Sequence, residues 1–246
     1  QTGAAIYYSG GIIGEVVKVD PSQLWRIVTA TFVHIGLEHF VLNMITLYYL
    51  GRLAEDLFGS KAFLALYLLS GMMGNVFVAI FTPDVIAAGA STALFGLFGT
   101  IGALRFIVQS PYIRHLSQSY TSLIVVNLIF SFMPGISMAG HIGGLVAGVM
   151  LAYVFPVRGE ARFMNRTYQM SAALSYLLLL LYFFVKQFMD STSSPKTYQW
   201  IFQVIYLLIF SGLIWFNLRH GDMIVIATAL SWLTVVCELW LYRKHQ

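Results

Sequence analysis

Charged side chains are scarce in this sequence of 246 residues, where Asp, Glu, Lys and Arg together make up 10% of the chain. An average soluble domain is about a quarter charged, so these residues are too few to cover a water-exposed surface. The shortage excludes a soluble globular enzyme, a disordered chain and a nucleic-acid-binding domain. We therefore interpret the net charge of +4 as loop charge that orients a membrane protein, and we expect no nucleic acid among its partners.

Cysteine is almost absent, since Cys237 is the only one in the sequence. A single cysteine excludes a disulfide framework and a cysteine-ligated metal site. The sequence also lacks a phosphate-binding glycine loop and the H-E-x-x-H spacing of zinc peptidases. We predict no cofactor and no metal.

Long apolar runs dominate instead, and 59% of the residues are hydrophobic. A spanning helix needs about 20 mostly apolar residues, and Pro and Gly at 134 and 135 favour a turn between two such runs. The predicted spans are 38–50 (shorter and more polar), 62–82, 85–104, two within 116–156, 167–185, 197–218 and 223–242. This pattern predicts an all-α, polytopic helix bundle that crosses the lipid bilayer several times.

Basic residues predict the orientation of these spans. Three loops carry them, at Arg52 and Lys61, at Arg105 and Arg114, and between 158 and 166, whereas the loops near 83–84 and 134–140 contain no Lys or Arg. The first set of loops is therefore expected in the cytoplasm. The start of the 85–104 span then lies near the opposite face.

Several polar residues lie within the predicted spans, where ionisable groups are costly and suggest function. His39 and Asn43 are four residues apart and share one face of a helix. Each of them alone is also explained by a hydrogen bond to a neighbouring helix. Asn75 and Asn127 have no such companion, and we expect both to hold helices together.

Ser91 follows a run of small residues that begins at Gly89, just inside the non-cytoplasmic boundary. There the backbone can turn into a helix whose first N–H groups have no partner within the helix. These donors form the positive end of the helix, which suits a developing negative charge.

His141 begins a second run of small residues, and it has no visible partner in its own segment. Small residues on two helices allow close approach, and the pairs concerned are Gly96 with Gly99 and Gly144 with Gly148. If these faces meet, Ser91 and His141 lie at similar depth. A serine within reach of a histidine is a nucleophile and base pair for acyl transfer, with His39, Asn43 and the Ser91 N–H as candidate oxyanion donors.

Several ordered motifs on separate spans resemble the rhomboid family of intramembrane serine proteases, in its bacterial form. The resemblance runs from Trp25 to Phe155. The matching residues are Trp25-Arg26, His34, His39-xxx-Asn43, Gly51-Arg52 with Glu55 and Gly59, Gly89-x-Ser91, and Gly140-His141-x-Gly143-Gly144.

This resemblance implies a six-helix core with Ser91 as nucleophile at the bottom of a cavity that opens to the outside. It implies that His141 is the general base and acid and that His39 and Asn43 line the oxyanion site. The residues expected to shape or support the substrate pocket are Gly89, Thr92, Phe95, which would pack on His141, and Trp25 and Arg26 in the first loop. The implied partners are transmembrane protein substrates, which would be cleaved near their outer end.

The chain departs from the family pattern at Thr92, where Gly is usual, and we expect this β-branched residue to narrow the substrate pocket or shift specificity. The family's first helix is expected upstream of residue 1, because 1–24 contains no span. The expected divisions are an extramembrane segment 1–24, a protease core 25–157, a loop and seventh helix 158–190, and two additional spans of unknown role in 191–246.

Two alternatives from other classes stay open at this point. A catalytically inactive rhomboid-like protein would bind transmembrane clients without cutting them, although such relatives typically lose the serine or the histidine. A transporter would use His39, Asn43 and His141 along a polar pathway, but no internal repeat or intramembrane carboxylate supports it. The expected location is the plasma membrane with an active site open to the extracellular side. The sequence assigns no oligomeric state.

Overall fold

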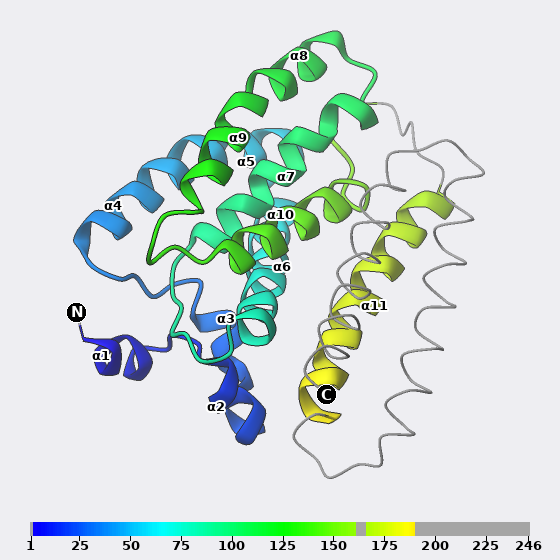
Figure 1. Ribbon diagram of the computed structural model, residues 1–246. Helices are drawn as coiled ribbons and strands as arrows, with labels where there is room; N and C mark the ends of the chain where they lie inside the picture. The colour runs from blue at the N-terminus through cyan, green and yellow to red at the C-terminus, as the bar shows by residue number, and fades with distance from the viewer. Residues whose placement is uncertain (1, 161–165, 190–246) are drawn as a thin grey trace.

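The computed structural model describes residues 2–160 and 166–189, which form a bundle of helices (Figure 1). Across these two ranges the only extended pairing is an isolated bridge between Ile12 and Ala87. The prediction of an all-α fold is therefore confirmed. The spans predicted at 197–218 and 223–242 lie outside the described residues.

The N-terminal residues form short helices, and the rest of the chain forms longer ones. The first group comprises α1 (Gly3–Tyr8), α2 (Gly14–Val19), the 3-10 helix η1 (Pro21–Trp25) and α3 (Arg26–Thr29). One continuous helical stretch follows, made of α4 (Leu37–Thr46), a π-helical turn η2 (Leu47–Gly51) and α5 (Arg52–Phe58). The remaining helices are α6 (Ser60–Phe81), α7 (Ser91–Ile107), α8 (Pro111–Ser119), α9 (Thr121–Phe130), α10 (Met138–Ala152) and α11 (Arg166–Met189).

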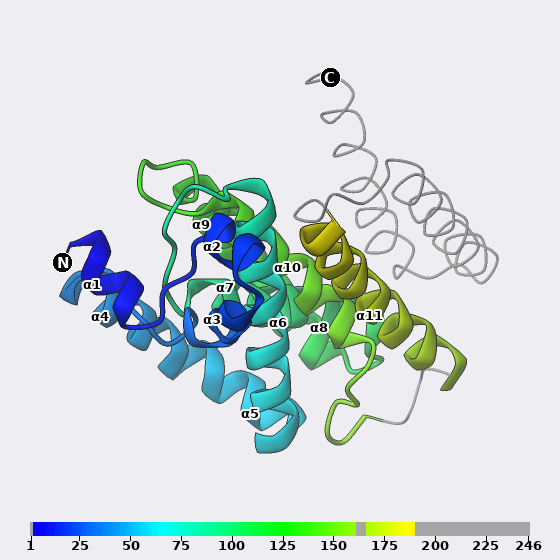
Figure 2. The same ribbon diagram turned by 90° about the horizontal axis from the view of Figure 1, so that it is seen from below.

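Helices α6, α7 and α10 form the centre of the bundle, with α4 on one side and α11 on the other (Figures 1 and 2). Glycines let α7 and α10 meet through their backbones: a methyl group on Gly148 would overlap the carbonyl of Gly96, and one on Gly144 would overlap the carbonyl of Thr92. The Thr100 hydroxyl donates across this contact to the carbonyl of Gly148, 3.0 Å away. The two glycine faces therefore meet, as the placement of Ser91 and His141 at similar depth requires.

Helix α6 is the only one in the described part of the chain that is both long and apolar enough to cross a membrane. The apolar helices α7 and α10 and the segment Gln169–Phe183 are shorter. The predicted span 85–104 is wrong at its start, because residues 85–90 are not helical and α7 begins at Ser91. Ala87 is held in the bridge to Ile12, and Gly89 has a φ of +145°, which a helix does not allow.

The predicted short span 38–50 is also longer in the structure. The helical stretch continues through the π-turn into α5 and stops at Gly59, whose φ of +87° ends the helix. The polar residues of α5 therefore extend this helix beyond its apolar part.

Polar groups hold the N-terminal segment together and also bind it to the bundle. Arg26 is buried, and its guanidinium donates to the carbonyls of Tyr7 and Gly11 while lying 3.8 Å from the centre of the Tyr7 ring. Asn75 on α6 donates to the carbonyl of Ile27 at 2.8 Å and to the hydroxyl of Thr31 at 3.0 Å. The expected packing role of Asn75 is thus confirmed. The same expectation is wrong for Asn127, whose side chain donates at 2.8 Å to the carbonyl of Leu123 in its own helix.

Candidate active site

Ser91 is the first residue of α7, and it is half-buried where the next residues along the helix, from Thr92 through Ile101, are buried. The chain reaches it through Gly89, whose N–H donates to the carbonyl of Ala30 at 2.9 Å. Ala30 ends α3, so the N-terminal helices hold the approach to Ser91. The serine hydroxyl lies where the first N–H groups of α7 have no helical partner.

His39 lies over Gly89 from the neighbouring helix α4. A methyl group on Gly89 would lie 2.9 Å from Nε2 of His39 and 3.6 Å from Oγ of Ser91, so both groups border the same space. The backbone N–H of Ile35 donates to Nδ1 of His39 at 3.3 Å. Nδ1 therefore carries the lone pair, and Nε2 of the neutral ring carries the proton that faces this space.

His34, in the loop before α4, packs against the ring of His39. Its ring meets that of His39 edge-on at 5.4 Å, and its Nδ1 donates to the carbonyl of Phe32 at 3.3 Å. Burial lowers the pKa of His34, so the ring is mainly neutral at pH 7. His34 therefore adds no positive charge beside the neutral ring of His39.

Asn43 is the single buried residue of α4. Its side-chain N–H₂ group has no hydrogen-bond partner within the described part of the chain. A buried donor without a partner carries an uncompensated desolvation cost. Such a donor is available to a ligand oxygen.

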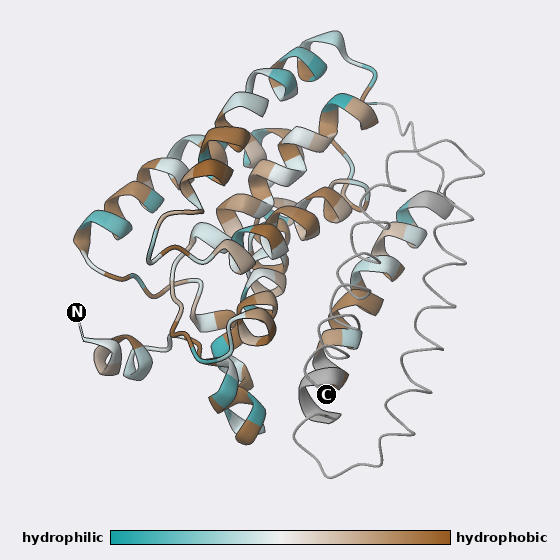
Figure 3. Ribbon diagram, viewed as in Figure 1, coloured by the Kyte–Doolittle hydropathy of each residue, from teal (hydrophilic) through white to brown (hydrophobic). Residues whose placement is uncertain are grey.

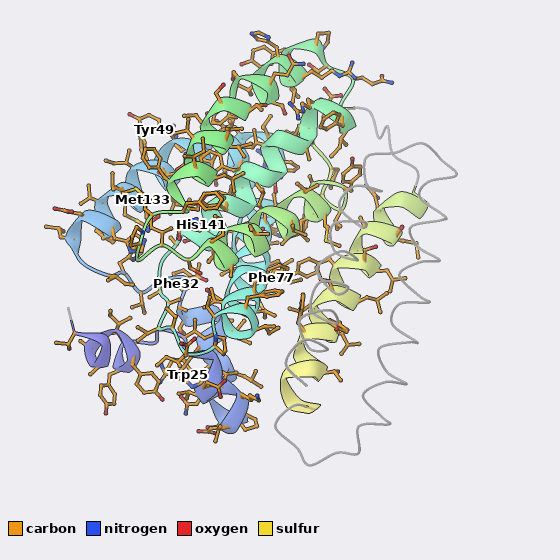
Figure 4. The ribbon with its side chains drawn as sticks, viewed as in Figure 1. Trp25, Phe32, Tyr49, Phe77, Met133 and His141 are labelled. Atoms are coloured by element: carbon orange, nitrogen blue, oxygen red, sulfur yellow. The ribbon has the colours of Figure 1, made fainter. Side chains whose placement is uncertain are left out.

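His141 lies in the first turn of α10, whose start is capped by Ser137 through its contact with the N–H of Gly140 at 3.2 Å. The imidazole stacks on Phe95 with ring centres 4.0 Å apart and planes inclined by 14°. This is the contact that the resemblance implies. Figure 4 shows His141 within the bundle, with Trp25 among the N-terminal helices.

The stack on Phe95 relates His141 to Ser91. Phe95 comes one helical turn after Ser91, so the two side chains share a face of α7. A methyl group on Gly140, next to His141, would lie 2.9 Å from the side chain of Thr92, next to Ser91. The starts of α7 and α10 are therefore in contact, and the histidine ring lies on the serine's face of α7.

Ser131, just after α9, is a partner of His141 that the sequence did not reveal. Its Oγ lies 2.6 Å from Nδ1 of His141, and the two residues are 2% and 6% exposed. The same hydroxyl donates to the carbonyl of Asn127 at 2.9 Å. A serine that bonds back to its own helix is common at a helix end, so nothing in the sequence distinguishes Ser131 from others.

The side chain of Thr92 is part of the packing between α7 and its neighbouring helices. Its side chain is buried between α6 and α10, where a methyl group on Gly74 would lie 2.7 Å from its Cβ. The hydroxyl has no hydrogen-bond partner within the described residues. Thr92 therefore fills space that the glycines of the neighbouring helices leave, and its expected effect on the substrate pocket or on specificity stays a prediction.

Trp25 and Arg26 belong to the N-terminal helices and are not brought to Ser91. Trp25 is exposed, and the Arg26 side chain donates to the carbonyls of Tyr7 in α1 and of Gly11. Within 2–160 and 166–189 no group of His, Cys, Asp and Glu residues could hold a metal ion.

Comparison with known proteins gives a consistent result. Residues 21–158 match the Rhomboid domain family. The chain is 33% identical over 135 residues to Rhomboid protease GluP of Bacillus subtilis, and the aligned region covers 54% of this chain and 26% of that protein. It is 35% identical over 133 residues to Rhomboid-like protease 3 of Toxoplasma gondii, covering 52% and 51%.

A plant relative is similar as well. RHOMBOID-like protein 4 of Arabidopsis thaliana is 34% identical over 160 residues, which is 64% of this chain and 40% of that protein. The matched region thus spans between about a quarter and a half of the length of these relatives.

Proposed function

This chain belongs to the rhomboid family, a family of multi-pass membrane proteins that includes proteases, and we propose that it is a serine endopeptidase that cleaves transmembrane segments. The observation that carries the proposal is the convergence of the Ser91 hydroxyl and the His39 ring over Gly89. A glycine there lets the His39 ring come close to the Ser91 hydroxyl, which places a hydrogen-bond donor beside a nucleophile.

Ser91 is the nucleophile and His141 the base in this proposal. Nε2 of His141 takes the hydroxyl proton while Oγ attacks the substrate carbonyl carbon, and the imidazolium then gives that proton to the leaving amine. Water hydrolyses the acyl-enzyme by the same steps in reverse. Stacking on Phe95 keeps the imidazole in one plane during both proton transfers.

His39 and Asn43 supply the donors for the oxyanion. Nε2–H of His39 faces the space over Gly89, and the amide of Asn43 is a buried donor with no other described partner. The N–H groups at the start of α7 add the positive end of a helix. One such donor is typically worth about 2.7–4 kcal/mol in the transition state.

The substrates we propose are transmembrane segments of other proteins, cut near their non-cytoplasmic end. Residues 25–157 form the protease core in this proposal, 158–190 add a loop and a seventh helix, and 1–24 belong to the extramembrane segment. The proposed location is the plasma membrane, with the site open to the extracellular side. We assign no role to 191–246.

The test is labelling of the purified chain in detergent with a fluorophosphonate probe, beside Ser91→Ala and His141→Ala. We expect labelling of the wild type and a loss of about 10⁴-fold or more in both variants. Cleavage of a reporter transmembrane segment in liposomes should follow the same order. Circular dichroism and gel filtration verify that each variant is folded.

Asn127→Ala serves as the matched control, because among the described residues its side chain donates only to the carbonyl of Leu123 in its own helix. It should label like the wild type. Labelling that persists in Ser91→Ala or His141→Ala would refute the assigned pair. A folded wild-type protein that fails to label would favour a client-binding role without catalysis.

A further inference from the structure

The stack between His141 and Phe95 leaves one question of geometry open. Stacking confines the imidazole to a plane, but a half-turn about the Cβ–Cγ bond exchanges the ring edges within that plane. A base at Nε2 requires that the proton of the neutral ring is on Nδ1. Something must therefore select both the ring orientation and the tautomer.

The hydrogen bonds of Ser131 make that selection. Its hydroxyl has one proton, and the Asn127 carbonyl, 2.9 Å away, can only accept. When that proton goes to the Asn127 carbonyl, the Ser131 oxygen, 2.6 Å from Nδ1 of His141, is left to accept. Nδ1 then donates, and the lone pair of the neutral imidazole lies on Nε2.

We propose that Ser131 is a positioning residue that holds His141 in the Nδ1–H form with Nε2 free to act as the base. The inference rests on the proposed function, since Nε2 matters as a base only if Ser91 is a nucleophile. Ser131 acts through His141 and does not touch the substrate. It fills the orienting position that a carboxylate occupies in a serine protease triad.

The hydrogen bond between Ser131 and His141 depends on the position of the end of α9. Ser131 directly follows α9, and its proton is committed to the carbonyl of Asn127 in that helix. Every residue of α9 is described and none of them is buried. Displacement of the end of α9 would remove the acceptor from Nδ1, so the tautomer of the base depends on where this helix lies.

The test compares Ser131→Ala and Ser131→Thr in the full chain, with Ser119→Ala as control. Ser119 ends α8 and donates to the carbonyl of Leu116 at 2.7 Å, a similar bond far from His141. Fluorophosphonate labelling gives the maximal inactivation rate and the probe affinity separately. Nitrogen-15 NMR of histidine-labelled protein reports the tautomer of His141, assigned by comparison with His141→Ala.

We expect Ser131→Ala to lower the maximal labelling rate about tenfold, the value of one hydrogen bond to an imidazolium, with probe affinity unchanged. Ser131→Thr keeps the hydroxyl and should restore most of the rate. In the spectrum, Ser131→Ala should shift His141 away from the Nδ1–H form. Ser119→Ala should match the wild type in both measurements.

Wild-type labelling and an unchanged tautomer in Ser131→Ala would overturn the inference while leaving the proposed function intact. A folded wild type that does not label overturns the proposed function, and the spectrum then decides the role of Ser131 alone. Loss of the Nδ1–H form in Ser131→Ala supports the hydrogen bond in that case, and its retention refutes it.

Discussion

Helices α7 and α10 are held in the molecule differently from helices α4 and α9. Between α7 and α10 the backbones touch at Gly96 and Gly148, and the hydroxyl of Thr100 bridges the contact. Helix α4 buries only Asn43, and α9 buries no residue. Large apolar side chains on these two helices are exposed, among them Leu42 at 65% and Ile129 at 62%.

The colouring by hydropathy shows the same contrast along the chain (Figure 3). Helix α9 is apolar although its residues are exposed or half-buried, whereas α8 before it is polar. Apolar exposure of this kind suits a surface that faces lipid. The proposed nucleophile Ser91 and base His141 thus lie on the tightly packed helices α7 and α10. The proposed hydrogen-bonding residues lie on the less buried helices, His39 and Asn43 in α4 and Ser131 directly after α9.

The largest effect should come from breaking the packed pair itself. Gly148→Val would drive a side chain into the carbonyl of Gly96, and we expect it to destabilise the fold by about 3 kcal/mol or more. Thermal unfolding in detergent measures this. Gly102→Ala is the control, because its methyl group would meet only the end of the Ile124 side chain. Equal stability in both variants would contradict the backbone contact.

A substitution at Gly89, where the start of α7 meets the His39 ring of α4, should lower turnover strongly and the stability of the fold only a little. Gly89→Ala would place a methyl group against the ring of His39, and we expect turnover to fall at least about 100-fold. Gly135→Ala shares the cost of a positive φ but would meet nothing within 4 Å. If both variants lose turnover equally, strain rather than the His39 contact is responsible.

Two asparagines sharpen the comparison. Asn43→Ala should lower turnover about 100-fold without lowering the melting temperature, because its amide N–H₂ has no described partner to lose. Asn75→Ala loses two hydrogen bonds and should cost about 1–3 kcal/mol of stability, with turnover per folded molecule unchanged. If Asn43→Ala lowered stability and Asn75→Ala lowered turnover, the roles assigned to these two residues would be wrong.

The smallest effect concerns two threonines of α7. Thr92→Val removes a buried hydroxyl that has no described partner, so stability should stay equal or rise by about 1 kcal/mol with activity retained. Thr100→Val loses bonds to the carbonyls of Gly96 and Gly148 and should cost about 1–2 kcal/mol. Calorimetry of both variants is the check, and a destabilised Thr92→Val would refute this account of its hydroxyl.

Local patterns in the sequence predicted the packed pair well. Glycines at helical spacing favour close approach of two helices, and Gly96, Gly144 and Gly148 lie where α7 and α10 meet. The position of Asn75 and Asn127 within apolar runs predicted that both hold helices together, which is right for Asn75 and wrong for Asn127. These features depend on one helix face at a time, which sequence periodicity reports directly.

Features that depend on loops could not be predicted in this way. The late start of α7 results from the bridge between Ile12 and Ala87, which joins segments far apart in the sequence. Ser131 meets His141 across a turn, where helical spacing carries no information. The burial of Thr92 depends on glycines of two other helices, which the sequence around Thr92 does not contain.

The contact of Gly148 with the Gly96 carbonyl determines how the two central helices can adjust to each other. Elsewhere in a protein core, side chains change rotamer and absorb small displacements. Glycine has no side chain to rotate, and its packing costs no side-chain entropy. The spacing of α7 and α10 is therefore set by the peptide chain itself, and it changes only when a whole helix moves.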